Sequence, residues 1–109
     1  LGGITRTLEL IAEAGLPVVV SSALDTSIGI SMGAHLAAAI PANEYDYGLG
    51  TVALLAGDVT DDPLTPVDGA LEVRRVVPSA RLLAEFAASR DRTNWWIARL
   101  ERCYALLAE

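Results

Sequence analysis

The sequence predicts an α/β fold, the closing part of a doubly wound sheet or of a (β/α) barrel. Two observations predict it: short β-branched runs alternate with segments of helical periodicity, and the connections between them are short. The chain has 109 residues, whereas a barrel of this kind takes about 250. Two parallel strands cannot bury both of their faces alone. We therefore expect the chain to be one section of a barrel.

The chain begins with a helix that leads into a buried strand. Apolar spacing predicts a helix over residues 5–14, and Gly15 is well placed to end it. Residues 17–20 read Pro-Val-Val-Val, with no polar alternation. Such a run is typical of a parallel strand that is buried on both faces.

A second helix is predicted over residues 27–40, where Asp25, Thr26 and Ser27 supply N-cap chemistry. Every fourth residue of this helix is a large apolar one: Ile28, Met32, Leu36 and Ile40. Glycine is unfavourable inside a helix by up to about 1 kcal/mol. We therefore expect Gly29 and Gly33 to be compensated by close packing against a neighbouring element.

The second half of the chain is less regular. Residues 48–51 lead into an apolar run at 52–55, which is either a second short buried strand or the start of a helix. Residues 67–74 alternate like a half-exposed strand or hairpin. Helices are predicted over residues 79–88 and 95–107, with Thr93 or Asn94 as the cap of the last one.

The charges exclude several classes of function. The chain carries 14 acidic residues and eight arginines but no lysine, for a net charge of −6. A lysine Schiff base, a lysine general base and a P-loop are therefore excluded for this chain. Residues 1–70 have a net charge of −8, which argues against a nucleic-acid surface. Residues 71–109 have a net charge of +2, and their arginines alternate with acids as on a solvated helix face.

No pattern indicates a membrane protein or a disulfide framework. The apolar stretches end well short of the roughly 18 residues that a membrane span needs, and no charged leader precedes one. The single cysteine, Cys103, is compatible with a reducing compartment, so we expect a cytoplasmic protein. One histidine and one cysteine do not make a zinc site.

Most candidate reactive residues have ordinary structural explanations. The serines lack the glycines of a Gly-x-Ser-x-Gly nucleophile elbow. His35 is interpreted as a packed or edge histidine of an alanine-rich helix, and Asp61-Asp62 as a solvated turn rather than a metal site. Gly48-Leu49-Gly50 lacks the third glycine of a dinucleotide fingerprint. The pair Trp95-Trp96 is more typical of a core plus an interface than of a ligand cage.

One feature favours a ligand site. Ser21 and Ser22 follow the first predicted strand, at the end where parallel α/β folds bind ligands. We expect their backbone N–H groups to lack further partners in the sheet. With the serine hydroxyls and the start of the helix at Ser27, these donors suit a carboxylate or a phosphate. The alternative is that the serines only cap the strand and the helix.

Several segments of the chain resemble the o-succinylbenzoate synthases of the enolase superfamily. They are Leu1-Gly2-Gly3-Ile4, the run from Leu16 through Ser21-Ser22-Ala23-Leu24-Asp25 to Gly29, and Gly48-Leu49-Gly50-Thr51. The closing Asn94-Trp95-Trp96-Ile97 and Cys103-Tyr104 resemble the actinobacterial branch of that family. The resemblance covers all of the chain but only about the last third of a family member.

The resemblance implies a lyase of menaquinone biosynthesis that dehydrates 2-succinyl-6-hydroxy-2,4-cyclohexadiene-1-carboxylate to o-succinylbenzoate. In this family a lysine removes the proton next to the carboxylate, and Mg²⁺ held by three acids stabilises the enediolate. The implied fold is a capping domain on a modified (β/α) TIM-like barrel. Residues 1–66 would form its last βα units, with strands at 17–22 and 48–55. Residues 67–109 would form a C-terminal strand or hairpin and helices that return to the capping side.

The resemblance does not extend to the catalytic groups. The chain has no lysine, and its acids do not match the family's metal ligands, so we expect it to supply no catalytic residue and to bind no Mg²⁺. Substrate binding does carry over. Ser21 and Ser22 match the serine-rich strand end and Gly48 matches the glycine of the last strand, segments that contact the substrate carboxylates largely through backbone N–H groups. The expected partner is a small dicarboxylate, with no nucleic acid and no membrane. Asp25 matches an acid to which the resemblance assigns no role.

Two other functions stay open from the sequence. An N-acylamino acid racemase or another enolase-superfamily enzyme shares the barrel but generally differs at the strand end where Ser21-Ser22 stand. A non-catalytic interaction domain, the remnant of a barrel, would keep the fold without the reaction.

Overall fold

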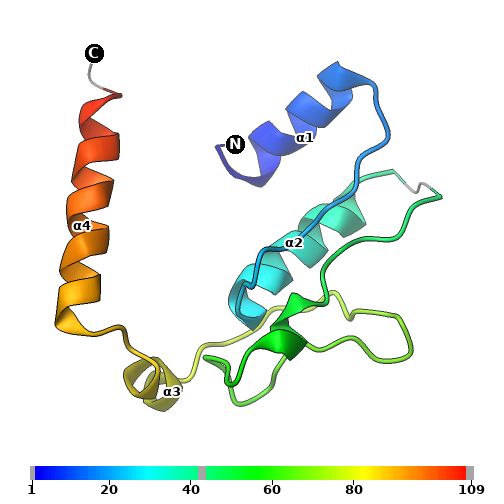
Figure 1. Cartoon of the computed structure of the whole chain (residues 1–109). Helices are drawn as coiled ribbons and strands as arrows, with labels where there is room; N and C mark the ends of the chain where they lie inside the picture. Colours follow the sequence, from blue (N-terminus) through cyan, green and yellow to red (C-terminus); the bar gives the residue numbers. More distant parts are fainter. Residues whose placement is uncertain (1, 42–43, 108–109) are drawn as a thin grey trace.

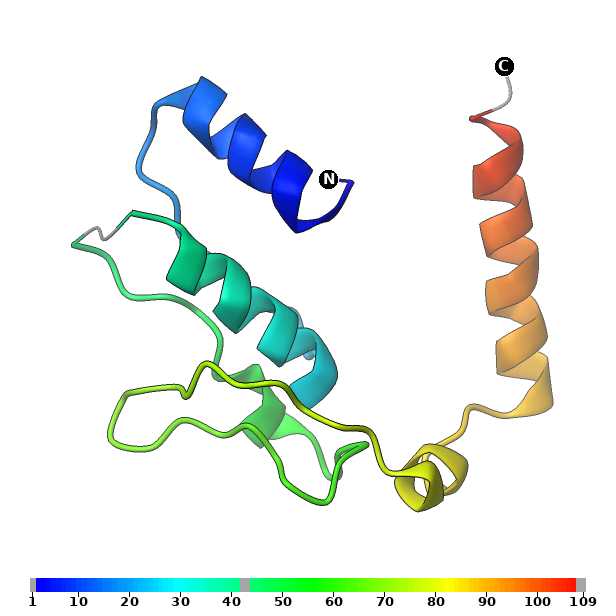
Figure 2. The same cartoon turned by 180° about the vertical axis from the view of Figure 1, so that it is seen from behind.

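The computed structural model describes residues 2–41 and 44–107, and its regular structure there is mostly helical. The elements are α1 (Gly3–Ala14), α2 (Ser27–Ala39), the 3₁₀-helix η1 (Thr51–Leu54), α3 (Ala80–Glu85) and α4 (Arg90–Ala105). Helices α1 and α2 pack against each other (Figure 1). Helix α4 stands away from both of them in either view and is joined to the rest through α3 (Figure 2).

Strands are reduced to two isolated bridges in the described part of the chain. Ser21 pairs with Gly48 in parallel, and Val67 pairs with Ala70 in antiparallel orientation. The segment at 17–20 is extended, but it is not buried on both faces, because Val19 is 47 % exposed. No other part of the described chain covers that face.

The prediction of a strand at 52–55 is wrong, and the helical alternative is confirmed. Thr51–Leu54 forms η1, which the Ala53 N–H stabilises by donating to the Gly50 carbonyl at 3.4 Å. Val52 is buried at 4 % exposure, whereas Leu54 is 74 % exposed. A single helical turn places one apolar side chain inside and leaves its neighbours in solvent, which a strand buried on both faces would not do.

Helix α1 confirms the first prediction and begins two residues earlier than expected. Gly15 ends it in the left-handed region at φ 61°, and its N–H donates to the Ile11 carbonyl. A residue with a side chain is disfavoured at this φ, which explains the glycine.

Helix α2 is the centre of the small core. Its buried residues are Ser27, Ile30, Ser31, Ala34 and Ala37. This face differs from the stripe of apolar residues at every fourth position, since Met32 is 61 % exposed. The expected close packing at its glycines is confirmed: a β-carbon on Gly33 would lie 2.9 Å from Leu49 Cδ2.

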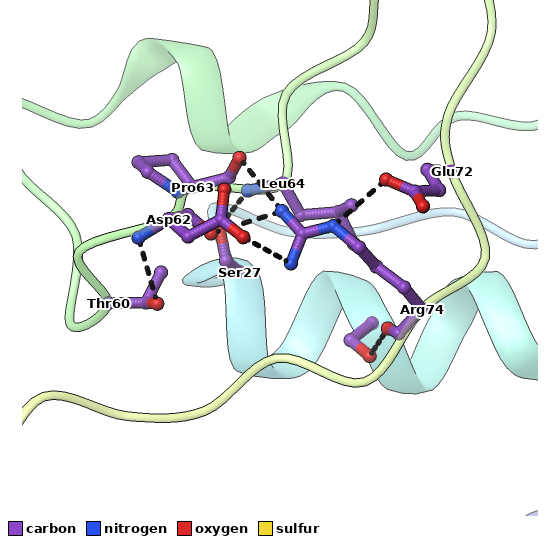
Figure 3. Close-up of polar contacts among 8 residues, drawn as sticks. Ser27, Thr60, Asp62, Pro63, Leu64, Glu72 and Arg74 are labelled. Atoms are coloured by element: carbon purple, nitrogen blue, oxygen red, sulfur yellow. Dashed lines mark hydrogen bonds and ion pairs between the residues drawn. The ribbon is translucent and has the colours of Figure 1, made fainter.

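Two serine hydroxyls of α2 tie later segments to the helix (Figure 3). Ser27 Oγ accepts a hydrogen bond from the Leu64 N–H at 2.7 Å, and Ser31 Oγ donates to the Arg74 carbonyl at 2.7 Å. The Arg74 guanidinium in turn forms ion pairs with Asp62 at 3.0 Å and Glu72 at 3.1 Å. These contacts hold two extended segments, around residues 62–64 and 72–74, against α2 without a β-ladder.

The hairpin expected at residues 67–74 is reduced to its turn. Val67 and Ala70 exchange two backbone hydrogen bonds, at 2.8 and 2.9 Å. Asp68 and Gly69 between them have φ values of 49° and 77°. Asp-Gly is a favoured pair for a two-residue turn with positive φ at both positions. The residues that follow, 71–79, do not pair as a strand.

The C-terminal helix is longer than expected at its start, and its predicted cap is wrong. Helix α4 begins at Arg90, and Ser89 is its cap, with Oγ accepting from the Arg92 N–H at 3.3 Å. The Thr93 hydroxyl donates to the Ser89 carbonyl at 3.0 Å, so Thr93 lies inside the first turn. Ser89, Thr93 and Asn94 are all residue types that cap helices and lie within six positions, so the sequence alone did not distinguish them.

The tryptophan pair on α4 lies on the surface of this chain rather than in its core. Trp95 and Trp96 are 42 % and 51 % exposed, and their rings meet edge to face with centroids 4.8 Å apart. The Arg92 guanidinium lies 4.4 Å from the centroid of the Trp95 ring. Arginine stacking therefore covers part of an aromatic surface that no other element of the described chain packs against.

The described residues do not form a barrel. The radius of gyration is 16.3 Å, against about 13 Å for a compact domain of this length. Among the described helices, none is long and apolar enough to cross a membrane.

The isolated chain of 109 residues is expected to unfold without a sharp cooperative transition. Its described core holds eight buried hydrophobic residues, while large side chains such as Leu100 and Leu54 are 69 % and 74 % exposed. So little burial offsets chain entropy poorly. Heating followed by far-UV circular dichroism, together with the dispersion of amide NMR signals, measures the effect. One sharp transition with well-dispersed amides would contradict it.

Candidate functional site

Ser21 and Gly48 lie side by side on two neighbouring extended segments. In their parallel bridge the Gly48 N–H donates to the Val20 carbonyl, and the Ser22 N–H donates to the Gly48 carbonyl, both at 2.9 Å. The bridge brings together the three residues that the sequence singles out. It also confirms that these two segments run in the same direction.

Two of the expected backbone donors are not available to a ligand. The N–H of Ser22 is used in the bridge, so the expectation that it lacks a partner is wrong, and the Gly48 N–H is used there as well. The Ser21 N–H makes no hydrogen bond within the described residues. In a parallel pair successive N–H groups point to opposite edges, which places that of Ser21 on the edge away from Gly48.

The hydroxyl of Ser22 is held from two sides. Its Oγ lies 3.0 Å from the Gly48 carbonyl oxygen and 2.7 Å from Thr51 Oγ1. Thr51 belongs to the Gly-Leu-Gly-Thr motif, but nothing in the sequence pairs its hydroxyl with a serine 29 positions away. The folded geometry therefore adds Thr51 to the site.

The hydroxyl of Ser21, unlike that of Ser22, is available to a ligand. It is exposed, and its Oγ makes no hydrogen bond within the described residues. A β-carbon added at Gly48 would lie 2.6 Å from Ser21 Oγ. A side chain at position 48 therefore requires the Ser21 hydroxyl to move.

Asp25 holds the turn that follows the two serines. Its Oδ2 accepts a hydrogen bond from the Ala23 N–H at 3.1 Å. Leu24 between them has φ 57°, a left-handed conformation that is costly for a bulky side chain. A β-carbon on Gly29 would lie 2.9 Å from Asp25 Cβ, so α2 packs closely on this turn. Asp25 thus has the structural task of fixing a strained turn beside the site.

The start of α2 already carries a carboxylate. Asp58 Oδ1 accepts hydrogen bonds from the Ser27 N–H at 3.1 Å and from the Val59 N–H at 2.8 Å. Thr26 stands at the cap position but makes no side-chain cap bond. The expectation that the start of this helix helps to hold an anion is therefore wrong, because Asp58 uses the Ser27 donor and adds its own negative charge.

The acidic pair at 61–62 is divided between two arginines. Asp61 forms an ion pair with Arg81 at 3.0 Å, and Asp62 forms one with Arg74 at 3.0 Å. A hydrogen bond from Ser79 and the Arg81 guanidinium lower the pKa of Asp61 below its usual value. Across residues 2–41 and 44–107, no three His, Cys, Asp or Glu side chains are grouped to hold a metal ion. The described residues therefore do not fit a Mg²⁺ site.

A cavity of about 760 Å³ opens between α2 and the segments that follow it, and neither serine lines it. Its walls include Ala34, Tyr47 and Leu71, and it shares Leu49 and Gly50 with the stretch after Gly48. Asp46 also lines this cavity, and the negative charge of its side chain does not suit a carboxylate ligand. The Ser21 hydroxyl remains the better candidate for binding one.

Curated proteins are similar to this chain over nearly its full length. It is 47% identical over 107 residues to the o-succinylbenzoate synthase of Mycobacterium marinum and 47% identical over 107 residues to that of Mycolicibacterium smegmatis. It is 46% identical over 107 residues to the o-succinylbenzoate synthase of Mycobacterium tuberculosis. Each comparison covers 98% of this chain. No protein-family model matches the chain.

The chain spans about a third of the length of the curated relatives it matches, 32% to 33% of each. The resemblance to o-succinylbenzoate synthases that the residues indicate is confirmed by these comparisons. The mycobacterial sources agree with the actinobacterial branch that the Trp-Trp segment suggests.

Proposed function

We propose that this chain is the C-terminal, substrate-anchoring third of an o-succinylbenzoate synthase. The enzyme is a carbon–oxygen lyase that dehydrates 2-succinyl-6-hydroxy-2,4-cyclohexadiene-1-carboxylate to o-succinylbenzoate in menaquinone biosynthesis, in the cytoplasm. The observation that carries the proposal is the 46% to 47% identity to proteins of that name over 98% of the chain.

The open architecture of the chain supports a place in a larger (β/α) barrel. Among the described residues, the segment ending at Ser21 has one parallel neighbour, at Gly48. Its other edge presents the unpaired Ser21 N–H, and Val19 leaves one face exposed. An edge and a face of this kind are covered by the next strand and helix in a barrel. Residues 1–66 then form the last βα units, and residues 67–109 return toward the capping domain.

The dehydration needs groups that this chain does not contain. Water leaves when a base takes the proton next to the ring carboxylate and the neighbouring hydroxyl departs, and the ring becomes aromatic. The chain has no lysine to act as that base. Mg²⁺, where it is bound, would stabilise the charge that develops on the carboxylate. Because the described acids do not fit a Mg²⁺ site, both the base and the metal ligands belong to other parts of the enzyme.

The task left to this chain is to hold the substrate. The Ser21 hydroxyl is exposed and free to donate to a carboxylate, Gly48 leaves room for it, and Ser22 fixes Gly48 in place. Contacts to a carboxylate remote from the reacting bond are equally strong in the ground state and in the transition state. Their loss therefore raises KM more than it lowers kcat.

The similarity to named synthases also favours this function over the two alternative functions. The three relatives reported above are all named synthases, which favours the dehydration over the racemase reaction. Near-half identity to enzymes over almost the whole chain favours a part of an enzyme over a non-catalytic interaction domain.

The isolated chain is expected to show no dehydratase activity with added Mg²⁺. A general base alone contributes roughly 10²–10⁴-fold, and the chain has neither that lysine nor the metal ligands. The loss of the cyclohexadiene substrate is followed by absorbance, with the complete synthase of Mycolicibacterium smegmatis as the positive control. Enzymatic turnover by the purified chain would overturn the assignment of catalysis to other parts of the enzyme.

Two matched glycine variants of the complete enzyme test the anchoring site. In Gly48→Ala the new β-carbon lies 2.6 Å from Ser21 Oγ, which forces that hydroxyl out of place. In Gly50→Ala it meets Pro66 Cγ at 3.4 Å, at the edge of ordinary contact. We expect KM to rise about tenfold for the first, which corresponds to about 1.4 kcal/mol, and to change little for the second. Equal KM values for the two variants would show that Gly48 serves only the turn.

A further inference from the structure

We propose that Thr51 is a positioning residue of this site. Its hydroxyl orders Ser22, and together they leave Ser21 as the one hydroxyl of the three that donates to a substrate carboxylate. This inference rests on the proposed function, because it gives separate tasks to residues of the same anchoring site.

The hydrogen bonds of Ser22 and Thr51 can be assigned by counting protons. Each hydroxyl has one proton to donate. The Gly48 carbonyl oxygen, 3.0 Å from Ser22 Oγ, can only accept, so the Ser22 proton goes there. The contact of 2.7 Å between Ser22 Oγ and Thr51 Oγ1 is then donated by Thr51. Both protons are used within the protein, and neither hydroxyl can donate to an anion.

This short chain of hydrogen bonds holds the backbone at Gly48. The Gly48 carbonyl accepts from both the N–H of Ser22, at 2.9 Å, and its hydroxyl, at 3.0 Å. A carbonyl oxygen has two lone pairs, so these two bonds satisfy it fully. Thr51, at the start of η1, thereby ties that turn to the strand end through Ser22.

Gly48 holds the backbone on both sides of Ser21, because its N–H donates to the Val20 carbonyl and its carbonyl accepts from the Ser22 N–H, both at 2.9 Å. Ser21 Oγ lies against the bare face of Gly48, in the space that a β-carbon there would take. If Gly48 shifts, the surface under the Ser21 hydroxyl shifts with it. Loss of the Thr51 or the Ser22 hydroxyl therefore acts on the ligand through Ser21. The two losses break the same chain of bonds, so their effects overlap.

The test is a double-mutant cycle in the complete enzyme with Thr51→Val, Ser22→Ala and the double variant. Thr51→Ser keeps the hydroxyl, and Ser21→Ala removes the proposed ligand donor. Thr93→Val is the matched control, because the Thr93 hydroxyl donates to the backbone carbonyl of Ser89, the cap of α4, at 3.0 Å. KM and kcat for the cyclohexadiene substrate are measured for each variant. Thermal denaturation supplies a second readout that does not depend on activity.

We expect Ser21→Ala to raise KM about tenfold or more, as for a hydrogen bond to a charged group. Thr51→Val and Ser22→Ala should each raise it about three- to tenfold, as for a neutral hydrogen bond, and the double variant no further. Thr51→Ser should restore the original KM, kcat should change less than KM throughout, and Thr93→Val should leave both unchanged. The melting temperatures of the Thr51 and Ser22 variants should show the same non-additivity.

The outcomes separate the two proposals. If the unaltered complete enzyme does not dehydrate the substrate, the proposed function is wrong, and the non-additivity of the melting temperatures still decides whether Thr51 positions Ser22. If the enzyme is active but the KM effects of Thr51→Val and Ser22→Ala add, or Thr51→Ser fails to rescue, the positioning task is wrong. A larger KM effect from Ser22→Ala than from Ser21→Ala would overturn the assignment of Ser21 as the donor.

Discussion

The parallel pairing of Ser21 with Gly48 is the constraint on which the site and much of the core depend. It requires two glycines for two different reasons. Gly48 leaves space for the Ser21 hydroxyl, and Gly33 on α2 leaves space for Leu49, the residue after Gly48. A side chain at position 48 would displace the Ser21 hydroxyl, and one at position 33 would displace the end of the Leu49 side chain. Gly33 lowers the stability of the helix by itself, and the close packing of Leu49 against it offsets this cost.

Two adjacent serines perform different tasks because side chains alternate along an extended segment. The Ser21 hydroxyl lies over the bare face of Gly48 and donates no hydrogen bond within the described residues. Ser22 points to Thr51 and gives its proton to the Gly48 carbonyl. A pair of neighbouring hydroxyls at a strand end therefore does not imply two ligand contacts. One hydroxyl can hold the backbone that positions the other. The hydrogen bonds that each oxygen makes within the protein show which hydroxyl is structural and which can bind a ligand.

Local chemistry was predictable from the sequence, and contacts across the chain were not. Gly15 ended α1 as expected, because positive φ is a property of one residue and its neighbours. The Ser27 N–H at the start of α2 was expected to bind a ligand. It donates instead to Asp58, 31 positions away in the sequence, and no local pattern indicates this contact. Thr51 was missed for the same reason. The strand at 52–55 failed because apolar runs of four residues fit a buried strand and a one-turn helix equally well. The resemblance singled out Ser21, Ser22 and Gly48, and the parallel bridge between Ser21 and Gly48 brings the three together.

Under the proposed function, the absence of lysine from this chain separates the group that reacts from the groups that hold the substrate. A base acts on the proton that moves, so its loss lowers kcat. A hydroxyl that holds a remote carboxylate contributes the same free energy before and during the reaction, so its loss appears in KM. In that proposal the hydrogen-bonded residues Thr51, Ser22, Gly48 and Ser21 are of the second kind, because none of them is a base that can take a proton from carbon. If this third of the protein anchors the substrate, substitutions of these four residues should change which dicarboxylates bind. They should not change how the bound substrate reacts.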